Sequence, residues 1–132
     1  MIKPNTILRI ARPTNNLSEI TDMYKNGLGF KILSHFENHE TFDGVILGHE
    51  HHPYHLEFTH HNKSVAGEAP TKDNLLVFYI PDKHEWKNAC NQMVASGFTE
   101  VHSFNPYWDK NGKTFEDIDG YRVVLQNDSW NK

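Results

Sequence analysis

The stretch Y-H-L-E-F-T-H-H, residues 54–61, alternates as a β-strand with two different faces does. One face would carry three apolar side chains and suits a hydrophobic core. The other would carry an imidazole, a carboxylate and a hydroxyl, which suits either solvent or a bound ligand. The apolar face consists of Tyr54, Leu56 and Phe58, and the polar face of His55, Glu57 and Thr59. Whether this polar face meets solvent or a ligand depends on the fold of the rest of the chain.

The composition is that of an ordinary globular chain. The 132 residues suit one compact domain, with 37% hydrophobic and 23% charged residues. A net charge of −4 argues against nucleic acid or an anionic membrane as the partner. The single cysteine, Cys90, excludes an intramolecular disulfide. The first residues have no apolar signal segment, so we expect a cytoplasmic protein without a membrane span.

The first half predicts one helix and four strands. Asn16 is a good N-cap with Glu19 three residues later, and Gly27 suits the left-handed position that ends a helix. The buried stripe of this helix would be Leu17, Ile20 and Tyr24. The expected strands lie at residues 7–12, 30–37, 44–48 and 54–61, with a hairpin connection at 38–43.

The second half repeats this order. Asp82 caps a helix with Glu85 three residues on, and Gly97 closes it. Its apolar stripe would be Trp86, Ala89, Cys90, Met93 and Val94. The expected strands lie at residues 75–80, 98–104, 112–117 and 121–127, and the last two are joined by a turn at 117–120.

The two halves indicate an internal duplication. The predicted caps Asn16 and Asp82 are 66 residues apart, and the other landmarks keep nearly the same offset. We therefore predict an α+β fold in a single domain with two tandem βαβββ modules, at about 5–61 and 74–128, joined by a linker at about 62–73. Each module would form a curled four-stranded sheet with a helix on one face. The opposite faces would enclose a cleft, which favours a ligand site.

This arrangement resembles the vicinal oxygen chelate superfamily, which includes glyoxalase I, extradiol dioxygenases and bleomycin-resistance proteins. The resemblance covers about residues 7–127. It rests on Met23-Tyr24 with Gly27-Leu28-Gly29-Phe30, on His55-Leu56-Glu57-Phe58-Thr59, and on the run from Phe115 to Leu125, F-E-D-I-D-G-Y-R-V-V-L. The segment Asn105-Pro106-Tyr107-Trp108 is also similar to one found in a subset of these proteins.

The metal enzymes of this superfamily place four ligands in the cleft, one on the first and one on the fourth strand of each module. Carried over to this chain, these positions fall on Arg9, Glu57, Leu75 and Val124. Only Glu57 can ligate a metal, because leucine and valine have no donor atom and arginine is a permanent cation. Arg9 would instead pair with Glu57 in a purely structural contact, or hold an anionic group of a ligand.

Other side chains would complete a pocket around this pair. Aromatic walls with a few fixed charges suit a flat or partly apolar molecule. The candidate ligand-binding residues are Arg9, His55, Glu57, Tyr79, Tyr107, Trp108 and Arg122. His55 is a general base, a ligand contact or only a neighbour, while Tyr107 and Trp108 could instead pack against a helix or a dimer partner. The sequence assigns no catalytic residue.

The histidines of the turn before residue 54 are a separate feature. His49, His51 and His52 would form a solvated patch that binds transition metals adventitiously, because imidazole suits nickel, copper and zinc. His60 and His61 would lie at the rim of the strand.

The expected function is that of a glyoxalase or bleomycin-resistance type protein that binds a small molecule in its cleft, without the family metal site and without a cofactor. The first alternative is a metal-dependent lyase, isomerase or dioxygenase that uses zinc, nickel, manganese or iron, and the second is a structural or regulatory domain with an empty cleft. The resemblance also implies a homodimer.

Overall fold

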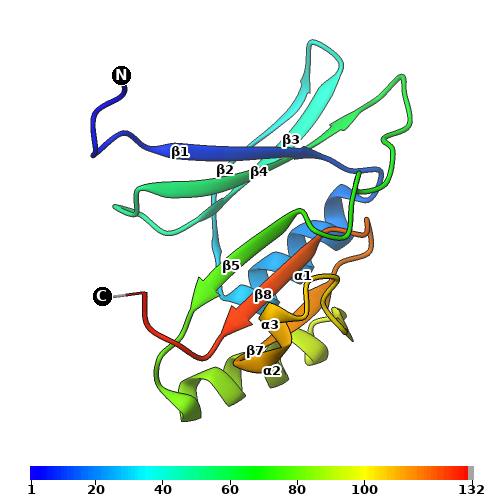
Figure 1. Ribbon diagram of the computed structural model, residues 1–132. Coiled ribbons are helices and arrows are strands. Elements are labelled where there is room, and N and C mark those ends of the chain that lie inside the picture. The colour runs from blue at the N-terminus through cyan, green and yellow to red at the C-terminus, as the bar shows by residue number, and fades with distance from the viewer. Residues whose placement is uncertain (131–132) are drawn as a thin grey trace. The chain divides into compact units, whose positions relative to one another are not determined.

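The computed structural model describes residues 1–130, with a βαβββ order in the first half and the same order, interrupted by one short helix, in the second (Figure 1). The first half holds β1 (Leu8–Pro13), α1 (Leu17–Leu28), β2 (Lys31–His39), β3 (Phe42–Gly48) and β4 (Tyr54–His61). The second holds β5 (Leu75–Tyr79), α2 (Lys83–Ala95), β6 (Thr99–Val101), α3 (Tyr107–Lys110), β7 (Gly112–Glu116) and β8 (Arg122–Gln126). The predicted α+β fold of two βαβββ modules is confirmed.

The chain divides into two compact units. The first consists of Met1–Lys25 and Gly29–Gly67, and the second of Asn26–Leu28 and Glu68–Lys132. No helix among residues 1–130 combines the length and the apolar character needed to cross a membrane.

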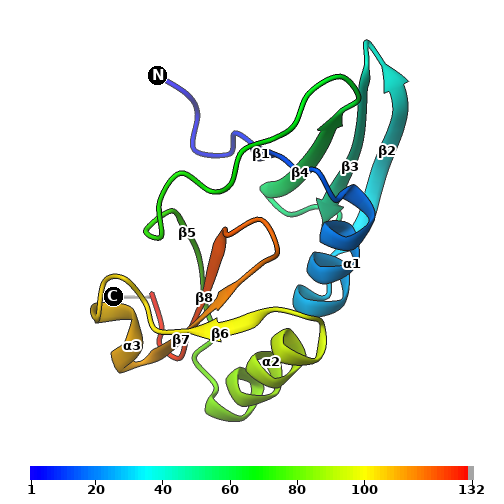
Figure 2. The same cartoon turned by 90° about the vertical axis from the view of Figure 1, so that its right-hand side faces the viewer.

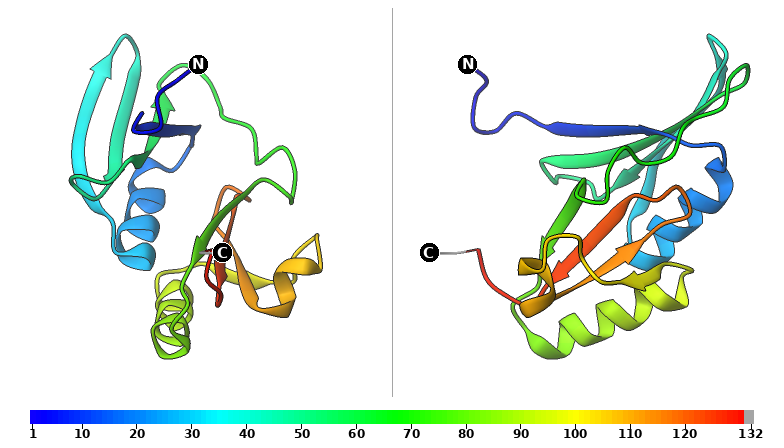
Figure 3. Two further views of the ribbon diagram at one scale, coloured as in Figure 1. Left: turned by 60° about the vertical axis from the view of Figure 1, so that its left-hand side comes forward. Right: turned by 45° about the vertical axis from the view of Figure 1, so that its right-hand side comes forward.

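The sheet of the first unit has the strand order β1-β4-β3-β2. The pair of β1 and β4 is parallel, while the other pairs are antiparallel, and β2 and β3 form a long hairpin (Figure 3). The apolar face of β4 packs on α1, where the rings of Phe58 and Tyr24 lie 4.9 Å apart. Leu56, Phe58, Ile20 and Tyr24 are buried. The predicted division of β4 into an apolar and a polar face is therefore confirmed.

The sheet of the second unit has the order β5-β8-β7-β6. As in the first unit, the strands that come first and last in the sequence, here β5 and β8, pair in parallel. Helix α2 covers one face of this sheet (Figure 2). The indole nitrogen of Trp86 donates to the carbonyl of Leu125 at 2.8 Å, which fastens the helix to β8. The core beneath the helix includes Cys90, Met93, Phe115, Val123 and Leu125.

The helix ends differ in part from the prediction. Asp82 caps α2, because its carboxylate accepts from the backbone N–H of Glu85 at 2.8 Å. The side chain of Asn16 makes no such bond in α1, so the predicted capping box is wrong there. Gly27 lies inside the helix, which ends at Gly29 with a φ of +72°. Of Gly27 and Gly29, it is Gly29 that takes the left-handed conformation, which glycine adopts without strain.

The segment after Phe98 also differs. The predicted strand at 98–104 is reduced to β6, and the short helix α3 follows it. The Asp109 carboxylate accepts from the backbone N–H of Ser103 at 3.1 and 3.2 Å, which turns the chain away from the sheet. Val94 is 54% exposed, so it lies outside the buried stripe of α2.

Candidate functional site in the first unit

The polar face of the first sheet brings together three of the predicted residues. In the parallel register of β1 and β4, Arg9 lies opposite His55 and Ala11 lies opposite Glu57. Paired residues point to the same side of a sheet, so the side chains of Arg9, His55 and Glu57 share the face turned away from α1. We call these three residues the arginine cluster.

A hydrogen bond joins two members of the arginine cluster. The Nε–H of Arg9 donates to Nε2 of His55 at 2.8 Å. Because a guanidinium has no acceptor, Nε2 must be the acceptor, and His55 is neutral with its proton on Nδ1. The cluster therefore holds a neutral imidazole whose outer N–H is a donor.

The contact between Arg9 and Glu57 is loose. The Nη1 atom of Arg9 lies 3.7 Å from Oε2 of Glu57, beyond the usual length of a charge-assisted hydrogen bond. The Arg9 side chain is 47% exposed and that of Glu57 is 16% exposed. Such an ion pair contributes about 0–1 kcal/mol. The exposed guanidinium edge can therefore exchange this contact for another anion at little cost.

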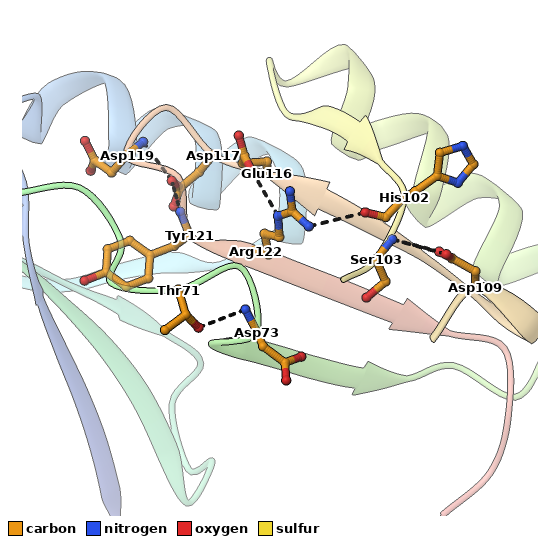
Figure 4. A network of polar contacts seen from close by, with 10 residues as sticks. All are labelled: Thr71, Asp73, His102, Ser103, Asp109, Glu116, Asp117, Asp119, Tyr121 and Arg122. Atoms are coloured by element: carbon orange, nitrogen blue, oxygen red, sulfur yellow. Dashed lines mark hydrogen bonds and ion pairs between the residues drawn. The ribbon is translucent and has the colours of Figure 1, made fainter. Parts of the chain in front are cut away.

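Arg122, the predicted charged residue of the second unit, is engaged differently (Figure 4). Its Nε–H donates to Oε2 of Glu116 at 2.9 Å, and its Nη1 donates to the carbonyl of His102 at 3.3 Å. Its side chain is only 7% exposed. Arg122 thus holds β8, β7 and the segment after β6 together.

The aromatic candidates of the second unit lie at two places. Tyr107 and Trp108 begin α3, with their rings 5.0 Å apart at nearly a right angle, and Tyr107 is 54% exposed. Tyr79 ends β5, is 38% exposed, and its ring lies 5.9 Å from that of Trp130. The role of these aromatic residues in ligand binding stays a prediction.

The histidine turn is largely exposed, as predicted, since His51 and His52 are exposed and His49 is half-buried. The ring of His49 lies 5.5 Å from that of Phe30 and 5.3 Å from that of His52, and His52 lies 6.0 Å from Tyr54. Burial raises the pKa of the Tyr54 phenol above its ordinary value. These rings pack against one another in the turn that leads into β4.

Gln126 and Ser64 escaped the sequence reasoning, and His61 was expected only at the rim of its strand. Gln126 is 2% exposed, and its Oε1 has no hydrogen-bond partner within the described residues. Gln126 is two residues beyond Val124 and four beyond Arg122, so the alternation along the strand places it on their face. His61 and Ser64 form a hydrogen-bonded pair at 2.6 Å beyond the end of β4. His61 shares the face of Glu57 by the same alternation, but Ser64 lies in a loop and carries no pattern.

The residues at the family's metal positions do not fit a metal. Arg9 stands at one of them and directs its cation at Glu57, the one carboxylate retained. In the second unit these positions are Leu75 and Val124, which have no donor atom. Across residues 1–130, no group of three or more His, Cys, Asp or Glu side chains is arranged to hold a metal ion.

Both halves of the chain match known sequence families. Residues 8–59 match the YycE-like N-terminal domain and residues 73–127 the YycE-like C-terminal domain. The uncharacterized protein YycE of Bacillus subtilis (strain 168) is 43% identical over 120 residues, which cover 91% of this chain and 86% of that protein. A crystal structure of a YycE protein of unknown function from Bacillus subtilis matches with a TM-score of 0.88 at 41% identity, covering 97% of this chain and 95% of that chain.

More distant structures share the fold alone. Glyoxalase I of Leishmania major matches with a TM-score of 0.72 at 18% identity, covering 92% of this chain and 86% of that chain. The fosfomycin resistance protein FosX of Mesorhizobium loti matches with a TM-score of 0.72 at 10% identity, covering 98% and 95%. The fold is thus that of the vicinal oxygen chelate superfamily, as the sequence motifs predicted. Within it, the chain belongs to the YycE-like family.

Proposed function

We propose that this chain binds a small molecule that carries an anionic group, and that Arg9 holds this group without a metal ion. One observation carries the proposal: the guanidinium is 47% exposed and only loosely paired with Glu57. A planar guanidinium suits carboxylate and phosphate groups, which it binds through two parallel N–H bonds. The hydrogen bond to His55 orients the guanidinium and leaves its Nη atoms for the ligand.

The other members of the arginine cluster would set the specificity of the site. The Nδ1–H of His55 is a donor, and Glu57 is an acceptor for a ligand hydroxyl or amine. A molecule with an anionic group and a neighbouring hydroxyl would match all three side chains. FosX is named for resistance to a small molecule, which is consistent with ligand binding on this fold. The homodimer stays a prediction of the resemblance, and sedimentation velocity tests it.

The test compares anion binding in two charge-matched variants. Inorganic phosphate, lactate and glycolate are titrated against the ¹⁵N-labelled, untagged protein, and amide shifts are followed by NMR. We expect saturable shifts around residues 9 and 55–57 that weaken about tenfold in Arg9→Ala, the loss of one charge-assisted interaction. Lys25→Ala removes the same charge from the exposed end of α1 and should leave binding unchanged.

Elemental analysis of the same protein provides the opposing outcome. After chelation, zinc, nickel, manganese and iron are added back in turn. A stoichiometric metal that survives dialysis, is lost in Glu57→Gln and accompanies unchanged anion binding in Arg9→Ala would overturn the proposal. The metal-dependent enzyme would then be the correct interpretation.

A further inference from the structure

A cavity lies where β1 and β4 end in the first unit. Its volume is about 180 Å³, and its walls include Pro13, Thr59, Phe42, His61 and Ser64. The face of β4 that carries Glu57 continues through Thr59 to His61, so the cavity lies along the same sheet as the arginine cluster. Pro13 lies four residue steps beyond Arg9 along the strand, which corresponds to about 13 Å. The cavity is therefore a separate place from that cluster.

Two rings form one wall of the cavity. Phe42 and His61 face each other across the β3–β4 pair, with ring centroids 4.6 Å apart and planes tilted by 36°. Phe42 is 40% exposed, although it belongs to a strand. An exposed aromatic ring that borders a cavity is a surface on which another flat ring can pack.

The polar part of the cavity is the pair of His61 and Ser64. The Nδ1 atom of His61 lies 2.6 Å from the hydroxyl oxygen of Ser64. If the hydroxyl donates to Nδ1, then Nε2–H is a donor and the serine oxygen still accepts. If Nδ1–H donates instead, the hydroxyl is the donor and Nε2 accepts. In either tautomer the pair presents one donor and one acceptor to a ligand.

Hydrogen bonds hold the walls in place before any ligand binds. The Asn15 side chain donates to the carbonyl of Ala66 at 2.9 Å and accepts from its N–H at 2.7 Å. The N–H of Thr14 donates to the carbonyl of Thr59 at 2.8 Å, and Nδ1 of His60 lies 3.0 Å from the carbonyl of Thr14. The loop after β4 is thus fastened to the connection between β1 and α1, and a preformed site loses little affinity to ordering.

We propose that this cavity is a second binding site, which takes an uncharged, single-ring aromatic molecule whose substituent both donates and accepts a hydrogen bond, such as a phenol. The size fits, because a cavity of about 150 Å³ holds benzene. The charge fits, because the described residues that line the cavity include no Lys, Arg, Asp or Glu. Phe42 and His61 contact the ring, while His61 and Ser64 bind its substituent.

The test uses three probes that differ in one property each. Phenol has the ring, the donor and the acceptor, anisole lacks the donor, and cyclohexanol lacks the aromatic ring. Each is titrated against the ¹⁵N-labelled full chain at neutral pH. We expect phenol to cause saturable amide shifts confined to residues 14–15, 42 and 59–66. Anisole and cyclohexanol should each bind about fivefold more weakly.

Variants assign the binding to the cavity. Phe42→Ala should weaken phenol binding about fivefold by removing the ring contact, and Ser64→Ala by a similar factor by removing half of the polar pair. Phe104→Ala removes a 71% exposed phenylalanine from the second unit and should change nothing. Arg9→Ala should also leave phenol binding unchanged, which separates this site from the anion site.

Three results would overturn the proposal. Phenol shifts that do not saturate, or that spread to residue 104, would show unspecific contact with exposed rings. Equal affinity for phenol, anisole and cyclohexanol would show that neither the ring nor the polar pair selects the ligand. Unchanged phenol affinity in folded Ser64→Ala and Phe42→Ala would place the binding elsewhere.

Discussion

Two arginines show how different surroundings give the same side chain different roles. Arg122 is 7% exposed and makes a 2.9 Å bond to Glu116, whereas Arg9 is 47% exposed and lies 3.7 Å from Glu57. The two partner carboxylates do not explain the difference, because Glu116 is 33% exposed and Glu57 is 16% exposed. The difference lies in the guanidinium groups, since a buried group with short hydrogen bonds contributes more to stability than an exposed one with a loose contact. Arg122 therefore serves the fold, and Arg9 is available for a ligand.

This contrast predicts the stability of two matched variants. We expect Arg122→Ala to lower the free energy of unfolding by about 2 kcal/mol, since it removes the charge-assisted bond to Glu116 and leaves the His102 carbonyl without its donor. Arg9→Ala should cost less than about 1 kcal/mol. Urea unfolding followed by circular dichroism measures both. Equal losses in the two variants would contradict the division of roles.

Cys90 links its burial to a dependence of stability on pH. Burial raises the pKa of the Cys90 thiol from 9.0 to about 11, with a smaller lowering by Lys113 and a smaller raising by Glu100. The folded state thus holds the thiol proton more tightly than the unfolded state. The raised pKa therefore adds to the free energy of unfolding. This stabilisation is fully present below pH 9 and is lost as the pH rises from 9 towards 11, at up to about 1.4 kcal/mol per pH unit.

Cys90→Ala is the matched control. Its free energy of unfolding should be lower at pH 8 because of the cavity, but should fall less steeply than that of the natural chain between pH 9 and 11. Titration of lysine and tyrosine is common to both proteins and cancels in the difference. Parallel curves for the two proteins, measured by urea unfolding at each pH, would show that the thiol does not titrate as described.

At the scale of elements, the two long helices begin in different ways. The side chain of Asp82 accepts from the N–H of Glu85 at the start of α2, whereas the side chain of Asn16 makes no cap bond in α1. In α1 the hydroxyl of Thr14 accepts from the N–H of Asn16 instead. Thr14 is 1% exposed, so this contact is well shielded from water.

The two caps should therefore respond differently to truncation. Asp82→Ala should destabilise the chain by about 1 kcal/mol, the usual cost of losing a capping side chain. Asn16→Ala should cost only a few tenths of that amount, because it removes no cap bond. Thermal unfolding monitored by circular dichroism at 222 nm compares the pair. A larger loss in Asn16→Ala than in Asp82→Ala would contradict the structure.

Local patterns in the sequence predicted most elements but not every end. The alternation in residues 54–61 predicted β4 and its buried face correctly, because side-chain direction along a strand is a local property. The end of α1 was wrong by two residues, since Gly27 and Gly29 are both plausible stops. Helix α3 was missed because the side-chain contact that turns the chain, from Asp109 to Ser103, joins residues six apart without a periodic pattern.

For the whole molecule, the duplication was visible because the landmarks of the two halves recur at a nearly constant offset. The bonds within the candidate sites were not visible, since they depend on register between distant segments. Arg9 and His55 lie 46 residues apart and meet only through the parallel pairing of β1 and β4. Asn15 and Ala66, which fasten the loop beside the cavity, lie 51 residues apart. No local pattern specifies either contact.

The pairing of the first strand with the last in each sheet has a consequence for synthesis on the ribosome. Strand β1 emerges early, yet in the sheet it pairs with β4, which is made tens of residues later. Strand β5 likewise pairs with β8, which is synthesised later. Because domains fold as units during synthesis, the nascent chain cannot complete either sheet gradually. Translation that stops within β8 would release a chain whose β5 has lost part of its partner strand.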